Sequence, residues 1–160
     1  MDKKQALNKI AGLCAMSEQC GYDMAEKMRK WELSAEDIEE IIAYLYKEKF
    51  LDDARYVRMY VRDKSRFNKW GRKKIEFMLA HKGLKGAFVS DILNEVLDAD
   101  DTLTVLVDLL RNKRRTIKSK DAYDEKAKLF RFAAGRGFGS DDIKRALSRL
   151  DLPDEQDDFS

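Results

Sequence analysis

The feature that most constrains the fold of this chain is an internal repeat of apolar residues that occurs three times. Leu33, Leu84 and Phe138 are equivalent anchors, and apolar residues recur five and nine positions before each anchor and five, nine and twelve positions after it. The recurring residues are Met24, Met28, Ile38, Ile42 and Leu45, then Ile75, Leu79, Val89, Leu93 and Val96, then Leu129, Ala133, Ile143, Leu147 and Leu150. Apolar steps of three and four residues predict an amphipathic helix on each side of a turn.

The residues around the anchors are typical of helix ends. Gly83 and Gly137 directly precede two anchors, and glycine readily adopts the left-handed conformation that ends many helices. Glu32 occupies this position in the first copy. Ser34 and Ser140 follow the turns and are suited to cap the next helix. Each copy is therefore predicted to contain a helix, a turn and a second helix.

One further helical segment precedes each of these pairs, at residues 6–15, 53–64 and 102–113. Three units of three helices then account for nearly all of the chain, and no strand-like alternation persists. We expect an all-α protein of three tandem three-helix repeats that form an elongated molecule, because each unit packs mainly on its neighbours. The expected boundaries are residues 1–49, 50–99 and 100–150, followed by an acidic, disordered tail at residues 151–160.

The charge is unevenly distributed, although the net charge at pH 7 is only +2. Residues 55–85 contain eleven Lys or Arg against two Asp or Glu, and a further concentration of positive charge lies between residues 111 and 131. Aromatic residues are interleaved with the central bases, which suits contact with phosphates and unpaired bases. Helical spacing favours Tyr56, Val57, Tyr60 and Val61 as core residues. Phe67 and Trp70, in the predicted connection, are the better candidates for exposure.

Ten basic residues make up the predicted binding surface for an anionic partner. They are Arg55, Arg58, Arg62, Arg66, Lys69, Arg72, Lys73, Lys74, Lys82 and Arg136. A solvated helix face that binds nothing is the alternative interpretation.

The sequence offers little to support catalysis. His81 is the only histidine, and it falls at a predicted helix C-terminus, where the helix dipole favours positive charge. Asp52 and Asp53 are better explained as an N-cap and a first-turn acid than as a metal site. Cys14 and Cys20 match no metal-ligand spacing and are expected to be buried, reduced thiols. We therefore expect no enzyme activity, no cofactor and no bound metal.

The N-terminal sequence and the hydropathy predict a cytoplasmic location. MDKKQALNKI lacks the apolar core of a signal peptide, and no apolar stretch approaches the length of a membrane span. We expect no membrane partner.

Two stretches, FLDDARYVRMYVR and WGRKKIEFMLAHKGL, resemble the central repeat of the RecX family of regulatory proteins. The matching residues are Leu51, Asp52, Asp53, Arg55, Tyr56, Gly71, Ile75, Leu79, Lys82 and Gly83. Arg136-Gly137-Phe138 is similar to the C-terminal Arg-Gly-Phe turn of that family, and the resemblance spans about residues 5–150. The first unit departs from the family pattern, because Cys20 is a poorer N-cap than the usual Ser. Glu32 also replaces the turn glycine that the other two units have.

The resemblance implies tandem helix-turn-helix-like units that regulate the RecA recombinase in DNA repair and the SOS response. Members of the family bind RecA and its filament on single-stranded DNA, lie in the helical groove of the filament, and inhibit ATP hydrolysis, strand exchange and coprotease activity. The expected partners are therefore the RecA filament and single-stranded DNA, with double-stranded DNA as a further candidate. The chain itself is expected to be a monomer. Two alternatives stay open: a helix-turn-helix-like protein that binds duplex DNA directly, and a scaffold for a protein partner.

Overall fold

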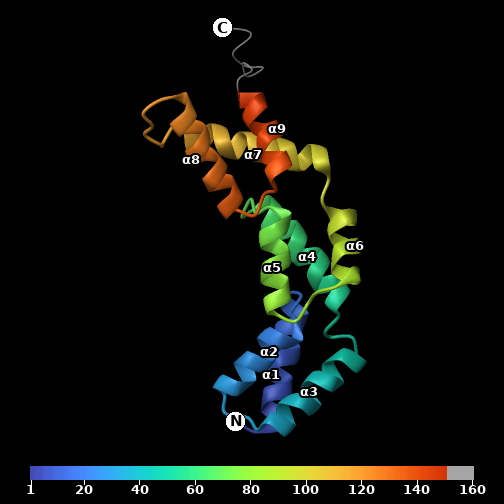
Figure 1. Cartoon of the computed structure of the whole chain (residues 1–160). Helices are drawn as coiled ribbons and strands as arrows, with labels where there is room; N and C mark the ends of the chain where they lie inside the picture. Colours follow the sequence, from blue (N-terminus) through green and yellow to red (C-terminus); the bar gives the residue numbers. More distant parts are fainter. Residues whose placement is uncertain (151–160) are drawn as a thin grey trace. The chain divides into compact units, whose positions relative to one another are not determined.

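The computed structural model describes residues 1–150, and every regular element in that range is a helix (Figure 1). The helices are α1 (Lys3–Met16), α2 (Gly21–Lys30), α3 (Ala35–Lys47), α4 (Asp53–Arg66), α5 (Arg72–His81), α6 (Ala87–Val96), α7 (Ala99–Arg114), α8 (Ala122–Gly135) and α9 (Ser140–Leu150). The all-α prediction is confirmed, and the three segments predicted before the helix pairs lie within α1, α4 and α7. The tail predicted at residues 151–160 lies outside the described residues.

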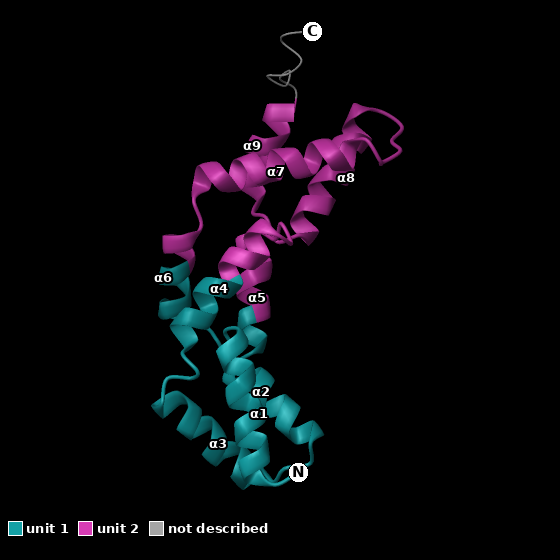
Figure 2. Ribbon diagram, turned by 180° about the vertical axis from the view of Figure 1, so that it is seen from behind, with its two compact units in different colours: residues 1–60, 79–92 teal, residues 61–78, 93–160 magenta. Residues whose placement is uncertain are grey.

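The chain divides into two compact units (Figure 2). Unit 1 contains residues 1–60 and 79–92, and unit 2 contains residues 61–78 and the chain from Leu93 onward. Helices α4, α5 and α6 each begin in one unit and end in the other. The central repeat therefore contributes backbone to both units.

The core of unit 1 is built mainly from α1, α2 and α3, with α3 packed against the other two. Its buried residues are Ala6, Ile10, Met24, Met28, Ile38, Ile41, Leu45 and Leu51. As predicted, Ser34 caps α3, because its hydroxyl accepts a hydrogen bond from the Asp37 N–H at 3.1 Å. Cys20 precedes α2 and makes no such side-chain bond, in agreement with its expected weakness as a cap.

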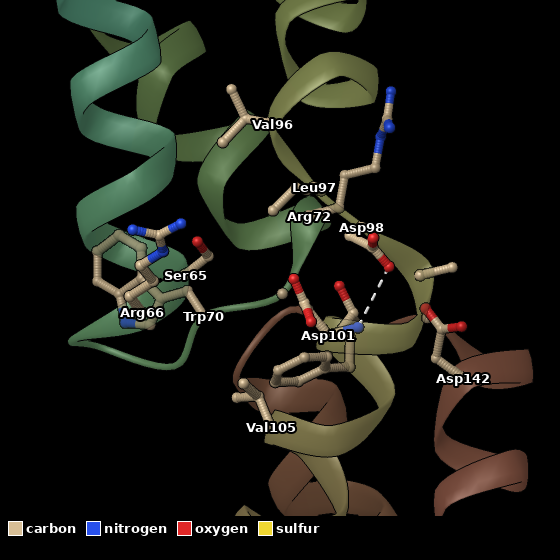
Figure 3. Close-up of a pocket in the computed structure, with 15 residues that line it drawn as sticks. Ser65, Arg66, Trp70, Arg72, Val96, Leu97, Asp98, Asp101, Val105 and Asp142 are labelled. Atoms are coloured by element: carbon tan, nitrogen blue, oxygen red, sulfur yellow. Dashed lines mark hydrogen bonds between the residues drawn. The ribbon is translucent and has the colours of Figure 1, made fainter.

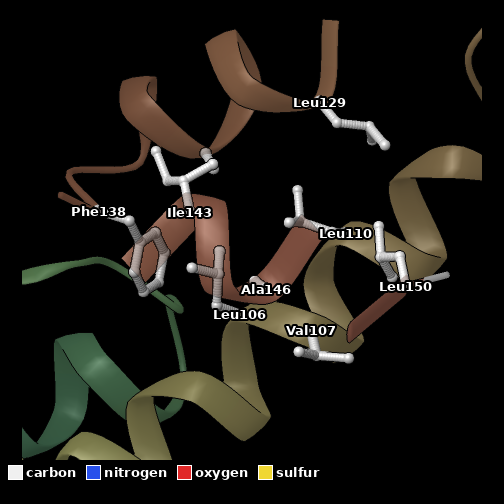
Figure 4. Packing of buried hydrophobic residues seen from close by; sticks show 9 residues of the cluster. Leu106, Val107, Leu110, Leu129, Phe138, Ile143, Ala146 and Leu150 are labelled. Atoms are coloured by element: carbon white, nitrogen blue, oxygen red, sulfur yellow. The ribbon is translucent and has the colours of Figure 1, made fainter. Parts of the chain in front are cut away.

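The core of unit 2 lies where α7 packs against α8 and α9 (Figure 4). Its buried residues are Leu106, Val107, Leu110, Leu129, Ala133, Phe138, Ile143, Ala146 and Leu150. The predicted cap at Ser140 is wrong by one residue. Ser140 is the first residue of α9, and Gly139 takes the N-cap position. The Gly139 carbonyl accepts the first hydrogen bond of the helix, from the Ile143 N–H.

The turns at the three anchors have the same backbone structure. In each, the anchor N–H donates to the carbonyl five residues earlier: Leu33 to Met28 at 3.2 Å, Leu84 to Leu79 at 3.0 Å and Phe138 to Ala133 at 3.2 Å. The preceding residue has a positive φ in every copy: 63° at Glu32, 77° at Gly83 and 96° at Gly137. These are the features of the Schellman motif. The apolar repeat read from the sequence therefore corresponds to a repeated helix end.

Side-chain burial in α4 agrees with the predicted periodicity. Tyr56, Val57, Tyr60 and Val61 are all buried. None of the helices within residues 1–150 is both long enough and apolar enough to cross a membrane.

Candidate anion-binding surface

The connection between α4 and α5, residues 67–71 in unit 2, carries aromatic and basic side chains. Phe67 is 78% exposed, as predicted, whereas Trp70 is only partly exposed. The Lys64 ammonium lies 5.0 Å from the centre of the Trp70 ring, and the Lys74 ammonium lies 4.6 Å from it. Such cation–π contacts hold the ring and the two ammonium groups in one arrangement.

The α8–α9 turn fixes the position of this connection through backbone contacts within unit 2. The Gly71 N–H donates to the Arg136 carbonyl at 2.8 Å, and the Lys73 N–H donates to the Gly137 carbonyl at 3.0 Å. The Arg136 guanidinium in turn donates to the Asn68 carbonyl at 3.0 Å. The fold thus brings Arg136 beside the start of α5, more than 60 residues away in sequence.

Two glycines make this close approach possible. A Cβ atom on Gly71 would lie 2.5 Å from backbone atoms of Gly137, and one on Gly137 would lie 2.4 Å from the Lys74 Cβ. No side chain larger than hydrogen fits at either position without movement of the backbone. The two glycines therefore position the basic start of α5.

Helix α5 begins with Arg72, Lys73 and Lys74 and has no acid in its first turn. The N-terminus of a helix carries partial positive charge, so three cations at this end are electrostatically unfavourable. Two N–H groups at this end, which have no partner within the helix, donate hydrogen bonds to carbonyls of the α8–α9 turn. These bonds offset part of the electrostatic cost. An external anion would offset more of it.

The ten predicted basic residues do not form one equivalent set. Arg55, Arg58 and Lys82 belong to unit 1, and the other seven belong to unit 2. Five make side-chain contacts that are identified within the chain: Arg55 with Glu18, Arg72 with Glu76 and Asn94, Lys74 with Trp70, Lys82 with Asp23, and Arg136 with Asn68. Arg58 also has a partner.

The remaining four residues are Arg62, Arg66, Lys69 and Lys73, which we call the open basic set. Their side chains have no hydrogen bond, ion pair or ring contact within the described part of the chain. Arg62, Arg66 and Lys73 are exposed, and Lys69 is half-buried. All four lie in unit 2, on or next to the α4–α5 connection. They are the residues of the predicted surface whose side chains are not engaged elsewhere in the described chain.

Lys82 illustrates the opposite case. Its ammonium lies 2.7 Å from a carboxylate oxygen of Asp23 and 3.0 Å from the Tyr56 hydroxyl, and its side chain is only 19% exposed. The same ammonium lies 5.6 Å from the ring centres of Tyr56 and Tyr60, and burial raises the pKa of both phenols. Lys82 therefore joins α2 to α4 inside unit 1. Its contact with an external partner stays a prediction.

A cavity of about 220 Å³ opens beside the connection in unit 2 (Figure 3). Arg66 and Trp70 lie on one side of it, and Asp98 and Asp142 lie on the other. Asp98 caps α7, since its carboxylate accepts the N–H groups of Asp100 and Asp101 at 2.7 and 3.3 Å. The sequence did not suggest this acidic lining. Because carboxylates would repel an anion inside the cavity, the candidate site is the surface of the connection and not the cavity.

The described residues offer no metal centre. No group of three His, Cys, Asp or Glu between residues 1 and 150 is placed to hold a metal ion. Asp52 caps α4 as predicted, accepting the Arg55 N–H at 3.0 Å, and Asp53 lies in the first turn. His81 ends α5, also as predicted. Cys20 is buried as expected, whereas Cys14 is only partly buried, and burial raises the pKa of both thiols.

Two family models match this chain. The model described as RecX, second three-helix domain, matches residues 52–93, and the model described as RecX, third three-helix domain, matches residues 99–147. Together these ranges cover more than half of the chain. The chain belongs to the RecX family. RecX proteins are regulatory proteins and not enzymes.

Individual relatives extend the likeness to most of the chain. The regulatory protein RecX of Pelodictyon phaeoclathratiforme is 31% identical over 150 residues, which is 94% of this chain and 89% of the relative. The RecX protein of Clostridium beijerinckii is 27% identical over 140 residues, and the chain spans 63% of its length.

Two solved structures support the fold. A crystal structure of RecX from Lactobacillus salivarius matches with a TM-score of 0.76 at 21% identity, covering 94% of this chain and 97% of that one. A second crystal structure of regulatory protein RecX matches with a TM-score of 0.80 at 18% identity, covering 91% of this chain and 71% of that one.

Proposed function

We propose that this chain binds the RecA filament on single-stranded DNA and inhibits the recombinase by occupying its surface. Membership of the RecX family supports the choice of partner. The observation that carries the proposal is the open basic set around the α4–α5 connection, next to the exposed ring of Phe67. Basic side chains without internal partners suit the acidic surface or the phosphates of a nucleoprotein filament.

The spacing of the open basic set adds a physical reason for binding. Arg62 and Arg66 are four residues apart in α4, so they lie on one face of the helix and repel each other. Lys73 adds a third positive charge at the N-terminus of α5, where the helix dipole is also positive. An anionic surface relieves these repulsions when it binds. Binding of an anionic surface to these cations is therefore more favourable electrostatically than its binding to the same number of widely separated surface cations.

The proposal is tested by reversing three of these charges. We expect the Arg62→Glu, Arg66→Glu, Lys73→Glu variant to require at least about tenfold more protein than wild type to inhibit RecA, because attraction becomes repulsion at three positions. The measurement is RecA ATP hydrolysis on saturating single-stranded DNA with this protein substoichiometric to RecA. Circular dichroism checks that the variant keeps its helices.

A matched control separates a local effect from a change in net charge. Lys4, Lys30 and Lys47 are exposed residues of unit 1 without side-chain partners in the described chain. Reversing these three lysines changes the net charge by the same amount and should leave inhibition at the wild-type level. Wild-type inhibition by a folded variant of the open basic set would remove this surface from the mechanism.

The same assay separates filament regulation from direct DNA binding. With DNA saturating and this protein scarce, competition for DNA cannot lower the rate of ATP hydrolysis. A direct DNA-binding protein would leave that rate unchanged and would instead bind duplex DNA alone, with an affinity that falls steeply with salt.

A further inference from the structure

The connection between α7 and α8 in unit 2 is a second basic surface that the proposed function does not use. Residues 111–120 contain six Lys or Arg and no Asp or Glu. Arg111, Lys113 and Arg114 lie in the last turn of α7, where they complement the negative end of the helix dipole. Lys118 and Lys120 lie beyond the helix, so the dipole does not account for them.

The start of this connection is fixed by backbone and core contacts. The N–H groups of Thr116 and Ile117 both donate to the Lys113 carbonyl, at 3.0 and 3.2 Å. The side chain of Ile117 packs against the core of unit 2. The backbone that leaves α7 is therefore held in place.

The end of the connection is fixed by Asp124 and Lys128. The Lys120 N–H donates to a carboxylate oxygen of Asp124 at 3.1 Å, and the Lys128 ammonium lies 3.2 Å from the same oxygen. Lys128 also donates to the Lys118 carbonyl. The Lys120 N–H and Lys128 together hold the pKa of Asp124 below its ordinary value, so this carboxylate stays charged and engaged. A connection fixed at both ends loses little conformational entropy when a ligand binds.

The side chains of Lys118 and Lys120 remain exposed on this fixed backbone, and neither has a partner in the described chain. Tyr123, in the first turn of α8, is 84% exposed and also lacks a side-chain partner there. Tyr123 follows Lys118 and Lys120 by five and three residues. An exposed aromatic ring close in sequence to unpaired cations is the pattern of sites that stack bases and bind phosphates of single strands. An acidic protein surface would use the lysines but would give the ring nothing to stack on.

We propose that the α7–α8 connection is a second contact for single-stranded nucleic acid, in which Lys118 and Lys120 bind backbone phosphates and Tyr123 stacks on an unpaired base. This contact requires no recombinase, so it stands or falls separately from the proposed function.

The test is the binding of fluorescently labelled oligothymidylate to the whole chain, measured by anisotropy over a range of salt concentrations. Each phosphate contact contributes about 0.7 to the slope of log affinity against log salt for single strands, so Lys118→Gln with Lys120→Gln should lower the slope by about 1.4. The matched control, Lys4→Gln with Lys47→Gln, should keep the wild-type slope.

The tyrosine is tested in the same titration. Tyr123→Ala should weaken binding by about tenfold and leave the salt slope unchanged, because stacking involves no counterion release. Tyr123→Phe should bind like wild type, since stacking needs the ring and not the hydroxyl.

Three results would overturn the proposal. A Lys118→Gln, Lys120→Gln variant that keeps the slope of the control would exclude phosphate contacts at these residues. Tyr123→Ala at wild-type affinity would exclude stacking. If the chain binds no oligonucleotide but the lysine variant inhibits RecA less well, the connection contacts an acidic protein surface and the nucleic-acid assignment is wrong.

Discussion

At Glu32 a charged side chain occupies a backbone conformation for which the other two repeats use glycine. Its φ of 63° lies in the left-handed region, as do those of Gly83 and Gly137. An L residue with a Cβ atom pays roughly 1 kcal/mol or more in this region, whereas glycine does not. At this turn, the first repeat therefore carries a local strain that the other two avoid.

We expect Glu32→Gly to raise the free energy of unfolding by about 0.5–1 kcal/mol, because relief of strain exceeds the entropy that glycine adds to the unfolded chain. Urea denaturation followed by circular dichroism measures the change. Glu48→Gly is the matched control, since Glu48 is the C-cap of α3 with a φ of −88° and should gain no relief. A Glu32→Gly variant no more stable than wild type would show that no strain is stored there.

The basic residues can be identified from the sequence, but which of them are paired within the chain cannot. In the sequence, nothing distinguishes Arg55 and Lys82 from Arg62 and Arg66, because all four lie in the same basic stretch, residues 55–85. Their partners, Glu18 and Asp23, lie 37 and 59 residues away in sequence. Only the fold determines which of two similar cations is paired within the chain. The open basic set could therefore be recognised only from the structure.

At the scale of elements, helix ends were predictable where their signals are local. Asp52 and Ser34 cap the helices that follow them, and the anchors mark the Schellman turns. Helix α5 is different, because its first N–H groups are satisfied by the α8–α9 turn rather than by a neighbouring side chain. Gly71 and Gly137 allow that contact, and no local pattern links them. The docking of these two turns could not be predicted from apolar periodicity.

We expect Gly71→Ala to destabilise the protein by about 1–3 kcal/mol, because the added methyl overlaps the backbone of Gly137 and must displace it. The same displacement moves Lys73 away from its position, so inhibition of RecA should weaken as well. Thermal unfolding and the ATPase assay measure the two effects. Gly139→Ala is the control, since a Cβ there meets nothing within 4 Å. Equal stability of the two variants would show that the turns do not require the close approach.

At the scale of the whole molecule, three sequence repeats coexist with two compact units. The repeats are defined by helix ends that recur along the sequence, whereas the two units are defined by which residues pack together in space. Helices α4, α5 and α6 each run from one unit into the other as continuous helices. Unfolding one unit alone would therefore cut all three helices partway along, and short helical pieces are unstable in water. This continuity should couple the stabilities of the two units.

A core substitution in unit 2 tests the coupling, because each unit contains one tryptophan, Trp31 in unit 1 and Trp70 in unit 2. Leu110 is fully buried in the core of unit 2, and Leu110→Ala should cost about 2–5 kcal/mol. In a Trp70→Phe background, fluorescence reports Trp31 alone. We expect Leu110→Ala to lower the urea midpoint of the Trp31 transition, although the substitution lies in the other unit. An unchanged Trp31 midpoint, with a circular dichroism transition that separates into two steps, would show that the continuous helices do not transmit stability between the units.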